Sequence, residues 1–134
     1  MQSDIEAKRE YLDQLSYIVL GAAISVHKEM GPGLLEAVYQ FCMTEELRSR
    51  GITIAQSVPV PLCYKGEPLN KDYVIDLLVE NEIIIELKAV EGILPVHEAQ
   101  ILSYLKLANK KLGFLINFNV PVIKTGFKRF VNGF

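Results

Sequence analysis

The stretch Asp72–Val90, DYVIDLLVENEIIIELKAV, constrains the fold of this chain more than any other segment. It contains two runs of Ile, Val and Leu separated by Glu80–Glu82, a segment typical of a tight turn. Nearly continuous apolar runs of this length are typical of strands that are covered on both faces of a sheet. The stretch therefore predicts a β-hairpin in the interior of the protein.

Three charged residues interrupt the two apolar runs: Asp76 in the first, and Glu86 and Lys88 in the second. Side chains alternate along a strand, so Glu86 and Lys88 lie on the same face. If the two strands pair as a hairpin, Asp76 lies beside Glu86 on that face. Two carboxylates held close together in an apolar sheet repel each other and lose hydration, which is costly unless donors or a cation offset it.

A hard divalent cation offsets this cost, because Mg²⁺ and Mn²⁺ prefer carboxylate and carbonyl oxygens as ligands. The alternative is structural: Glu86 and Lys88 form an ion pair at the end of a strand, and Asp76 caps a turn. The combination of all three residues, each surrounded by aliphatic side chains, favours the metal site over this alternative.

The same residues resemble a known set of motifs. Ile75–Asp76 followed by Glu86–Lys88 resembles the metal-binding core of the PD-(D/E)xK nuclease superfamily. Gly33–Tyr39, GLLEAVY, resembles the signature of the GxxExxY family within it, and Gln100–Tyr104, QILSY, resembles the QxxxY element of its RecB-like branch. The motifs stand in the expected order, and the resemblance extends from about residue 15 to residue 133.

This resemblance implies an α/β fold with a restriction-endonuclease-like core, in which helices flank a mixed sheet of four or five strands. It also implies that Asp76, Glu86 and the Leu87 carbonyl bind Mg²⁺ or Mn²⁺. Glu36 is implied as a further ligand, directly or through water. The structural alternative for Glu36 is a carboxylate that complements the dipole of a helix in its first turn.

The implied activity is metal-dependent hydrolysis of a nucleic-acid phosphodiester bond. Lys88 is then expected to orient the attacking water and to stabilise the developing negative charge. Gln100 and Tyr104, one helical turn apart, are expected to donate to a phosphate or to the site carboxylates. The alternative is a non-catalytic nucleic-acid- or protein-binding module on the same fold, since a fold does not determine a function.

The remaining segments predict helices and strands around the hairpin. Apolar residues at helical spacing predict helices over 14–30, 34–50 and 95–109, and residues 1–13 are expected to form a frayed, partly helical leader to a single domain over 14–134. Pro59 and Pro61 predict an edge strand over 52–62, because proline has no N–H for a central strand. Residues 112–118 predict a buried strand, and residues 122–134 predict a terminal strand or a short helix.

The distribution of charge suggests where a nucleic acid would bind. The net charge is −2, but no acidic residue follows Glu98. The cations beyond that position are Lys106, Lys110, Lys111, Lys124, Lys128 and Arg129. These cations predict a phosphate-binding surface, whose small size predicts weak binding unless a homodimer or a partner subunit enlarges it. The alternative is a solvated charge asymmetry without a partner.

Two further observations concern the environment of the protein. Cys42 and Cys63 lie in unlike segments without zinc-ligand spacing, which predicts reduced thiols in a cytoplasmic protein. No apolar run approaches the roughly 20 residues that span a bilayer, so no membrane partner is expected.

Overall fold

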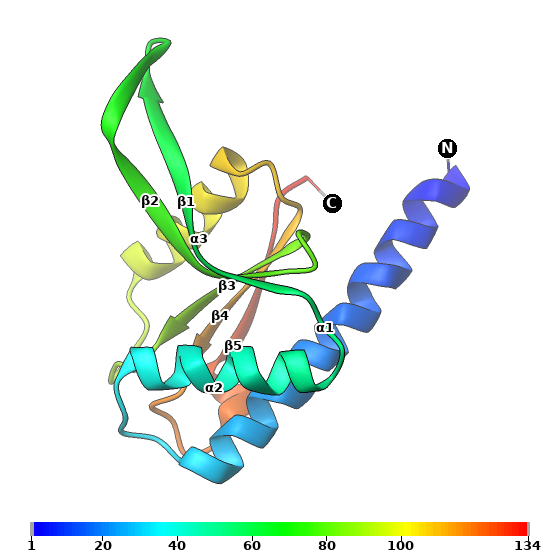
Figure 1. The fold of residues 1–134 in the computed structure, drawn as a ribbon, viewed down its shortest axis with the longest axis vertical. Helices are drawn as coiled ribbons and strands as arrows, with labels where there is room; N and C mark the ends of the chain where they lie inside the picture. The colour runs from blue at the N-terminus through cyan, green and yellow to red at the C-terminus, as the bar shows by residue number, and fades with distance from the viewer. Residues whose placement is uncertain (1, 134) are drawn as a thin grey trace.

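The computed structural model describes residues 2–133, which form an α/β fold (Figure 1). The helices are α1 (Gln2–Met30), α2 (Glu36–Ser49), α3 (Pro95–Leu107) and the short 3₁₀ helix η1 (Ile123–Gly126). The strands are β1 (Ile54–Tyr64), β2 (Glu67–Val79), β3 (Ile83–Lys88), β4 (Leu112–Asn117) and β5 (Phe127–Val131). They form one mixed sheet in the order β1-β2-β3-β4-β5, in which only β3 and β4 run parallel among the described strands.

The sheet lies between two layers of helices, as the apolar runs predicted. Helices α1 and α2 pack against one face, and α3 packs against the other. Every residue of β4, and all of β3 except Lys88, is buried, since these strands are covered on both sides. The expected mixed sheet of four or five strands flanked by helices is therefore confirmed. No helix among residues 2–133 is long and apolar enough to cross a membrane.

Helix α1 differs from the expectation of a frayed leader that ends near residue 13. One continuous helix runs from Gln2 to Met30, without a break between residues 13 and 14. Leu12 and Leu15 are both buried in the core below α2, and this burial on both sides of the expected boundary explains why the helix continues through it. The division of the chain into a leader and a domain over 14–134 stays a prediction.

The hairpin of β1 and β2 extends far beyond the rest of the sheet (Figure 1). Pro59 and Pro61 lie in β1, which is the edge strand that they predicted. The outer part of β2 is exposed as far as Val74, and burial begins at Ile75. The expectation that this strand is covered on both faces from Asp72 onward is therefore wrong, because the outer part of the hairpin extends beyond the helices and meets α3 through Tyr73 and Tyr104.

Both strands of this hairpin change faces where it joins the sheet. Ile54 and Leu77 belong to the core on the α1–α2 side, whereas Val58 and Ile75 pack against the core on the α3 side. Regular alternation would put all four on one face, since each pair is separated by an even number of residues. The change occurs at Ser57, which lies within β1 yet has a φ of 50°. The register of the two strands places Ser57 opposite Asp76.

Candidate functional site

The pairing of β2 with β3 brings two carboxyl groups together. Leu77 pairs with Ile85, so Asp76 and Glu86 occupy the next positions of the same antiparallel register. The amide N–H of Asp76 donates to Oε1 of Glu86 at 3.2 Å, and the amide N–H of Leu87 donates to Oδ2 of Asp76 at 2.8 Å. The structure thus places these side chains next to each other, as the alternation of residues along the two strands predicted.

Burial changes the protonation of this pair. The Glu86 side chain is 5 % exposed. Burial, together with the negative charge of Asp76, raises the pKa of Glu86 from 4.5 to about 9. Burial also raises the pKa of Asp76, although the hydrogen bond from the Leu87 amide opposes that rise. Glu86 therefore keeps its proton at neutral pH in the protein alone, and a divalent cation held by Asp76 and Glu86 would take the place of that proton.

Lys88 and Tyr104 are close to the two carboxyl groups. The positive charge of Lys88 lowers the pKa of both Asp76 and Glu86, which puts its ammonium group within electrostatic reach of the pair. Tyr104 of α3 is nearly buried, and burial with the neighbouring carboxylates raises its pKa to about 12. Its hydroxyl is therefore a hydrogen-bond donor at neutral pH. Its ring lies 5.1 Å from that of Tyr73 on the exposed hairpin.

Glu36 lies farther from the pair than a third ligand would. Its charge raises the pKa of Asp76, which shows electrostatic reach, but its side chain is exposed at the start of α2. Over residues 2–133, no three His, Cys, Asp or Glu side chains are close enough together to hold a metal ion. The chemistry of the two carboxyl groups of Asp76 and Glu86 suits a divalent cation. The position of Glu36 suits a contact with such a cation through water better than direct coordination.

The rest of the Gly33–Tyr39 segment has a structural role. Tyr39 is fully buried and stacks on Phe118 with ring centroids 4.4 Å apart. Its hydroxyl donates to the Gly31 carbonyl at 2.6 Å and accepts from the Leu34 amide at 3.1 Å. Gly33 has a φ of 96°, a conformation that favours glycine. Tyr39 therefore fixes the loop that sets the position of α2 and, with it, of Glu36.

Gln40 is a residue of this region that the motifs did not identify. Its Nε2 donates to the Asp76 carbonyl at 3.2 Å and to Oγ of Ser57 at 3.3 Å. It thereby connects α2 to both strands at the point where they change faces. The sequence spacing could have identified Gln40, because it follows Glu36 by four residues and so lies on the same face of the helix.

The remaining predicted residues contribute less to the geometry. Leu87 meets Asp76 through its amide, and no hydrogen bond of its carbonyl to the pair is found among the described residues. Gln100 lies on α3 one turn before Tyr104, and its side chain makes no hydrogen bond with another residue of the 2–133 range. Nδ1 of His97 accepts from the Leu94 amide at 3.0 Å and caps α3.

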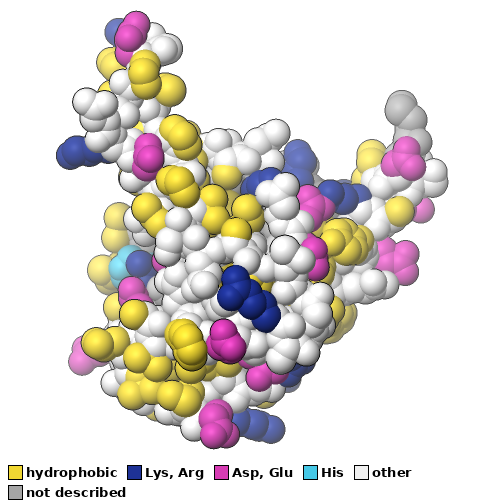
Figure 2. Space-filling model, in the orientation of Figure 1, with side chains coloured by type: hydrophobic (Ala, Val, Ile, Leu, Met, Phe, Trp, Pro, Cys, Tyr) yellow, Lys and Arg dark blue, Asp and Glu magenta, His cyan; other side chains and the backbone are white. Residues whose placement is uncertain are grey.

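The C-terminal cations are less available than their sequence suggested. Lys128 pairs with Glu98 at 2.7 Å, and Arg129 lies 3.9 Å from Asp13. On the face shown in Figure 2, Lys and Arg side chains are interspersed with Asp and Glu. The predicted phosphate-binding surface on the last third of the chain is therefore partly neutralised by acidic residues from α1 and α3.

Comparison with known proteins gives one match. The family model described as the PD-(D/E)XK nuclease superfamily matches residues 13–130. No curated protein and no solved structure matches the chain significantly. The matched range contains the whole sheet except the last residue of β5, both carboxyl groups and Lys88. The chain therefore belongs to the PD-(D/E)XK nuclease superfamily, whose nucleases generally use divalent metal ions.

Proposed function

We propose that this protein is a nuclease that hydrolyses nucleic-acid phosphodiester bonds with Mg²⁺ or Mn²⁺ bound by Asp76 and Glu86. The observation that carries the proposal is the adjacency of these two buried carboxyl groups on β2 and β3, with the amide of each strand bonded to the carboxyl of the other. A bound divalent cation would supply Lewis-acid stabilisation of the charge that develops on the phosphodiester.

The other residues of the site have distinct roles in this proposal. Lys88 orients the attacking water and stabilises the developing charge with its compact ammonium group. Glu36 would contact a bound cation through water, and the Leu87 carbonyl would be a further oxygen ligand. Tyr104, whose hydroxyl stays protonated, donates to a phosphate oxygen, and Gln100 one turn earlier donates along the same helix face.

The assignment to a branch of the superfamily is also part of the proposal. The segments Gly33–Tyr39 and Gln100–Tyr104 support membership of the GxxExxY family and its RecB-like branch. We expect the protein to act in the cytoplasm, which agrees with the unpaired thiols of Cys42 and Cys63. Because part of the C-terminal charge is neutralised, we expect a homodimer or a partner subunit to enlarge the nucleic-acid surface.

A cleavage panel tests the proposal. Linear and circular DNA and RNA, single- and double-stranded, are incubated with the protein in Mn²⁺, in Mg²⁺ and in chelator. We expect metal-dependent cleavage of at least one substrate, and a loss of at least about 100-fold in Asp76→Asn and Glu86→Gln, as for groups that act on the transition state. Glu45→Gln, which removes an exposed carboxylate of α2, is the matched control and should keep full activity.

Two results would contradict the proposal. Cleavage that persists in both carboxyl variants would place the chemistry elsewhere. Metal-independent binding of nucleic acid without cleavage of any substrate would support the non-catalytic binding module on the same fold.

A further inference from the structure

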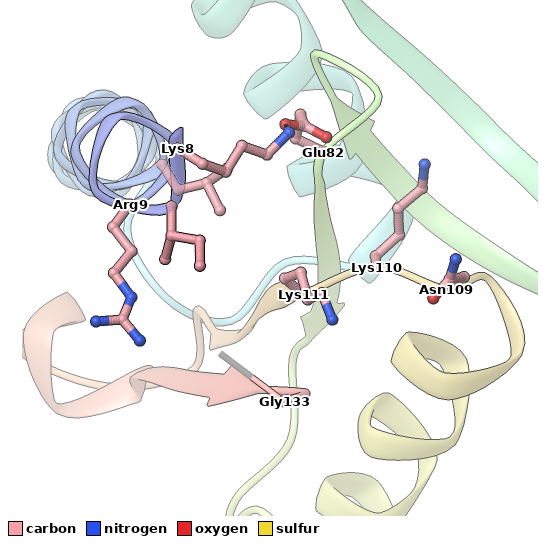
Figure 3. A pocket seen from close by; sticks show the side chains of 9 residues that line it. Lys8, Arg9, Glu82, Asn109, Lys110, Lys111 and Gly133 are labelled. Carbon is pink, nitrogen blue, oxygen red and sulfur yellow. Dashed lines mark ion pairs between the residues drawn. The ribbon is translucent and has the colours of Figure 1, made fainter. Parts of the chain in front are cut away.

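A cavity of about 540 Å³ opens between the N-terminal half of α1 and the end of the sheet at which β3 and β4 begin (Figure 3). Its wall includes Glu82 just before β3, and Lys110 and Lys111 just before β4. Glu82 precedes Glu86 by four residues, which is roughly 13 Å along an extended strand. The cavity is therefore a second feature, separate from the carboxyl pair.

Positive charge predominates in the wall of this cavity. The wall contains Lys8 and Arg9 from α1 and Lys110 and Lys111 from the segment before β4, and Glu82 is its single acidic residue among the described residues (Figure 3). Lys8 forms an ion pair with Glu82. Lys110 and Lys111 form no ion pair with a carboxylate of residues 2–133, so positive charge remains in the wall after Lys8 has paired with Glu82. Like charges this close repel one another, and an anion in the opening would offset the repulsion.

The two lysines before β4 are held in place by the backbone that carries them. The amide of Asn132 donates to the Lys111 carbonyl at 2.9 Å, and its side-chain Nδ2 donates to the Lys110 carbonyl at 3.1 Å. The amide of Lys110 donates to the Leu105 carbonyl at 2.9 Å, and its Nζ donates to Oδ1 of Asn81 at 3.3 Å. The segment is thus positioned before any ligand arrives, which lowers the entropic cost of binding.

The wall also has an apolar part, formed by Ile5 and Leu12 of α1. Small-molecule sites typically have volumes of about 300–1,000 Å³ and combine an apolar wall with a few polar groups. A ligand for this cavity should therefore carry both an anionic group for the lysines and a flat or apolar body for α1. A nucleoside with a phosphate has this combination.

We propose that this cavity binds the phosphate group of a nucleotide, either a free nucleotide or the phosphorylated end of a nucleic-acid strand. The two sources share the phosphate that meets Lys110 and Lys111, with the sugar and base against the exposed side chain of Ile5. This site goes beyond the proposed cleavage and does not depend on it, because the Asp76 and Glu86 carboxyl groups lie outside the cavity wall.

Calorimetric titration of the full chain in chelator tests this site without contribution from a metal ion. The probes are adenosine, its monophosphate and its triphosphate, and one short oligonucleotide with and without a 5′-phosphate. We expect at least one phosphorylated probe to bind at least tenfold more tightly than its unphosphorylated partner. Tighter binding by the free nucleotides or by the phosphorylated oligonucleotide identifies which source the cavity takes.

Charge-reversed variants locate the binding. The double variant Lys110→Glu, Lys111→Glu should bind the phosphorylated probe at least tenfold more weakly than the wild type. Lys28→Glu combined with Lys124→Glu makes the same change in net charge at exposed positions outside the cavity wall, and should leave the affinity unchanged. Lys111→Gln alone should weaken binding several-fold, which keeps the test decisive if the double variant does not fold. Asp76→Asn should bind like the wild type whether or not the protein cleaves nucleic acid.

Three results would overturn the proposal. The first is equal affinity for probes with and without phosphate, which includes the absence of binding at millimolar concentration. The second is an equal loss of affinity in the two double variants, which would indicate a general effect of net charge. The third is unchanged binding in the folded Lys110→Glu and Lys111→Glu protein.

Discussion

The amide N–H of Asp76 donates to Oε1 of Glu86 at 3.2 Å, so the two carboxyl groups lie side by side within the sheet. With the pKa of Glu86 raised from 4.5 to about 9, the folded protein binds this proton more tightly than the unfolded chain does. The contribution of Glu86 to the free energy of unfolding should therefore be complete below its unfolded pKa. It should fall as pH rises through the interval up to about 9 in the metal-free protein.

Urea denaturation in chelator at several pH values across that interval measures this effect. Glu86→Gln removes the titrating group, so the difference between the slopes of wild type and variant isolates its contribution. Identical slopes for the two proteins would mean that Glu86 has no raised pKa in the folded state.

Replacing either carboxyl group by its amide should not destabilise the metal-free protein. Glu86→Gln resembles the protonated acid that is already present, and Asp76→Asn retains an oxygen that can accept from the Leu87 amide. We expect the free energy of unfolding to stay within about 1 kcal/mol of the wild type or to rise, because neither change adds a charge to the buried pair and Asp76→Asn removes one. A loss of roughly 3–5 kcal/mol, as for a broken buried ion pair, would instead show that these residues stabilise the fold as partners.

Metal binding should release a proton at neutral pH. The cation takes the place of the proton that Glu86 holds, so Mn²⁺ affinity should rise as the pH increases towards about 9. Titration calorimetry in buffers with different ionisation enthalpies counts the protons released. Glu86→Gln should lose most of the affinity. Binding that releases no proton in the wild type would contradict the assignment of the cation to this pair.

Lys88 should act on cleavage rather than on metal binding. Lys88→Ala removes a nearby positive charge, so Mn²⁺ affinity should be unchanged or higher, while the cleavage rate should fall by at least about 100-fold. Lys88→Arg should restore little activity, because a planar guanidinium does not replace a compact ammonium group. Full cleavage activity in Lys88→Ala would refute this role.

Gln40 should matter for the position of Asp76. Gln40→Ala removes the donor to the Asp76 carbonyl and should reduce the free energy of unfolding by about 1 kcal/mol, as for one hydrogen bond. We also expect a several-fold loss of Mn²⁺ affinity, which a purely structural bond would not produce. Gln40→Glu cannot donate and should show the same loss. Gln56→Ala on the exposed surface of β1 is the control. Unchanged metal affinity in both Gln40 variants would limit Gln40 to a structural role.

The central strands and the carboxyl pair could be predicted because local patterns determine them. Continuous apolar residues predicted that β3 and β4 are buried on both faces, and both are. Two-residue alternation and a hairpin register were enough to place Asp76 beside Glu86. The turn between these strands was recognisable at Glu80 and Asn81, which both adopt positive φ.

Other features depend on contacts that no local pattern encodes. The change of faces occurs at Ser57, which is neither glycine nor proline, and its side chain accepts a hydrogen bond from Gln40 of another element. The pairing of Lys128 with Glu98 and of Arg129 with Asp13 joins residues far apart in the sequence. The cavity beside α1 likewise exists only once the helix, the sheet and the segment before β4 have come together.

The most direct test of the central claim is an anomalous difference map from crystals of the protein soaked in Mn²⁺. We predict a peak at the Asp76 and Glu86 carboxyl groups, within coordination distance of an oxygen of each, since hard divalent cations take oxygen ligands. The same soak of Glu86→Gln crystals should show no peak there. A map without a peak at the pair in the wild type, or with Mn²⁺ bound only at other carboxylates, would contradict the account.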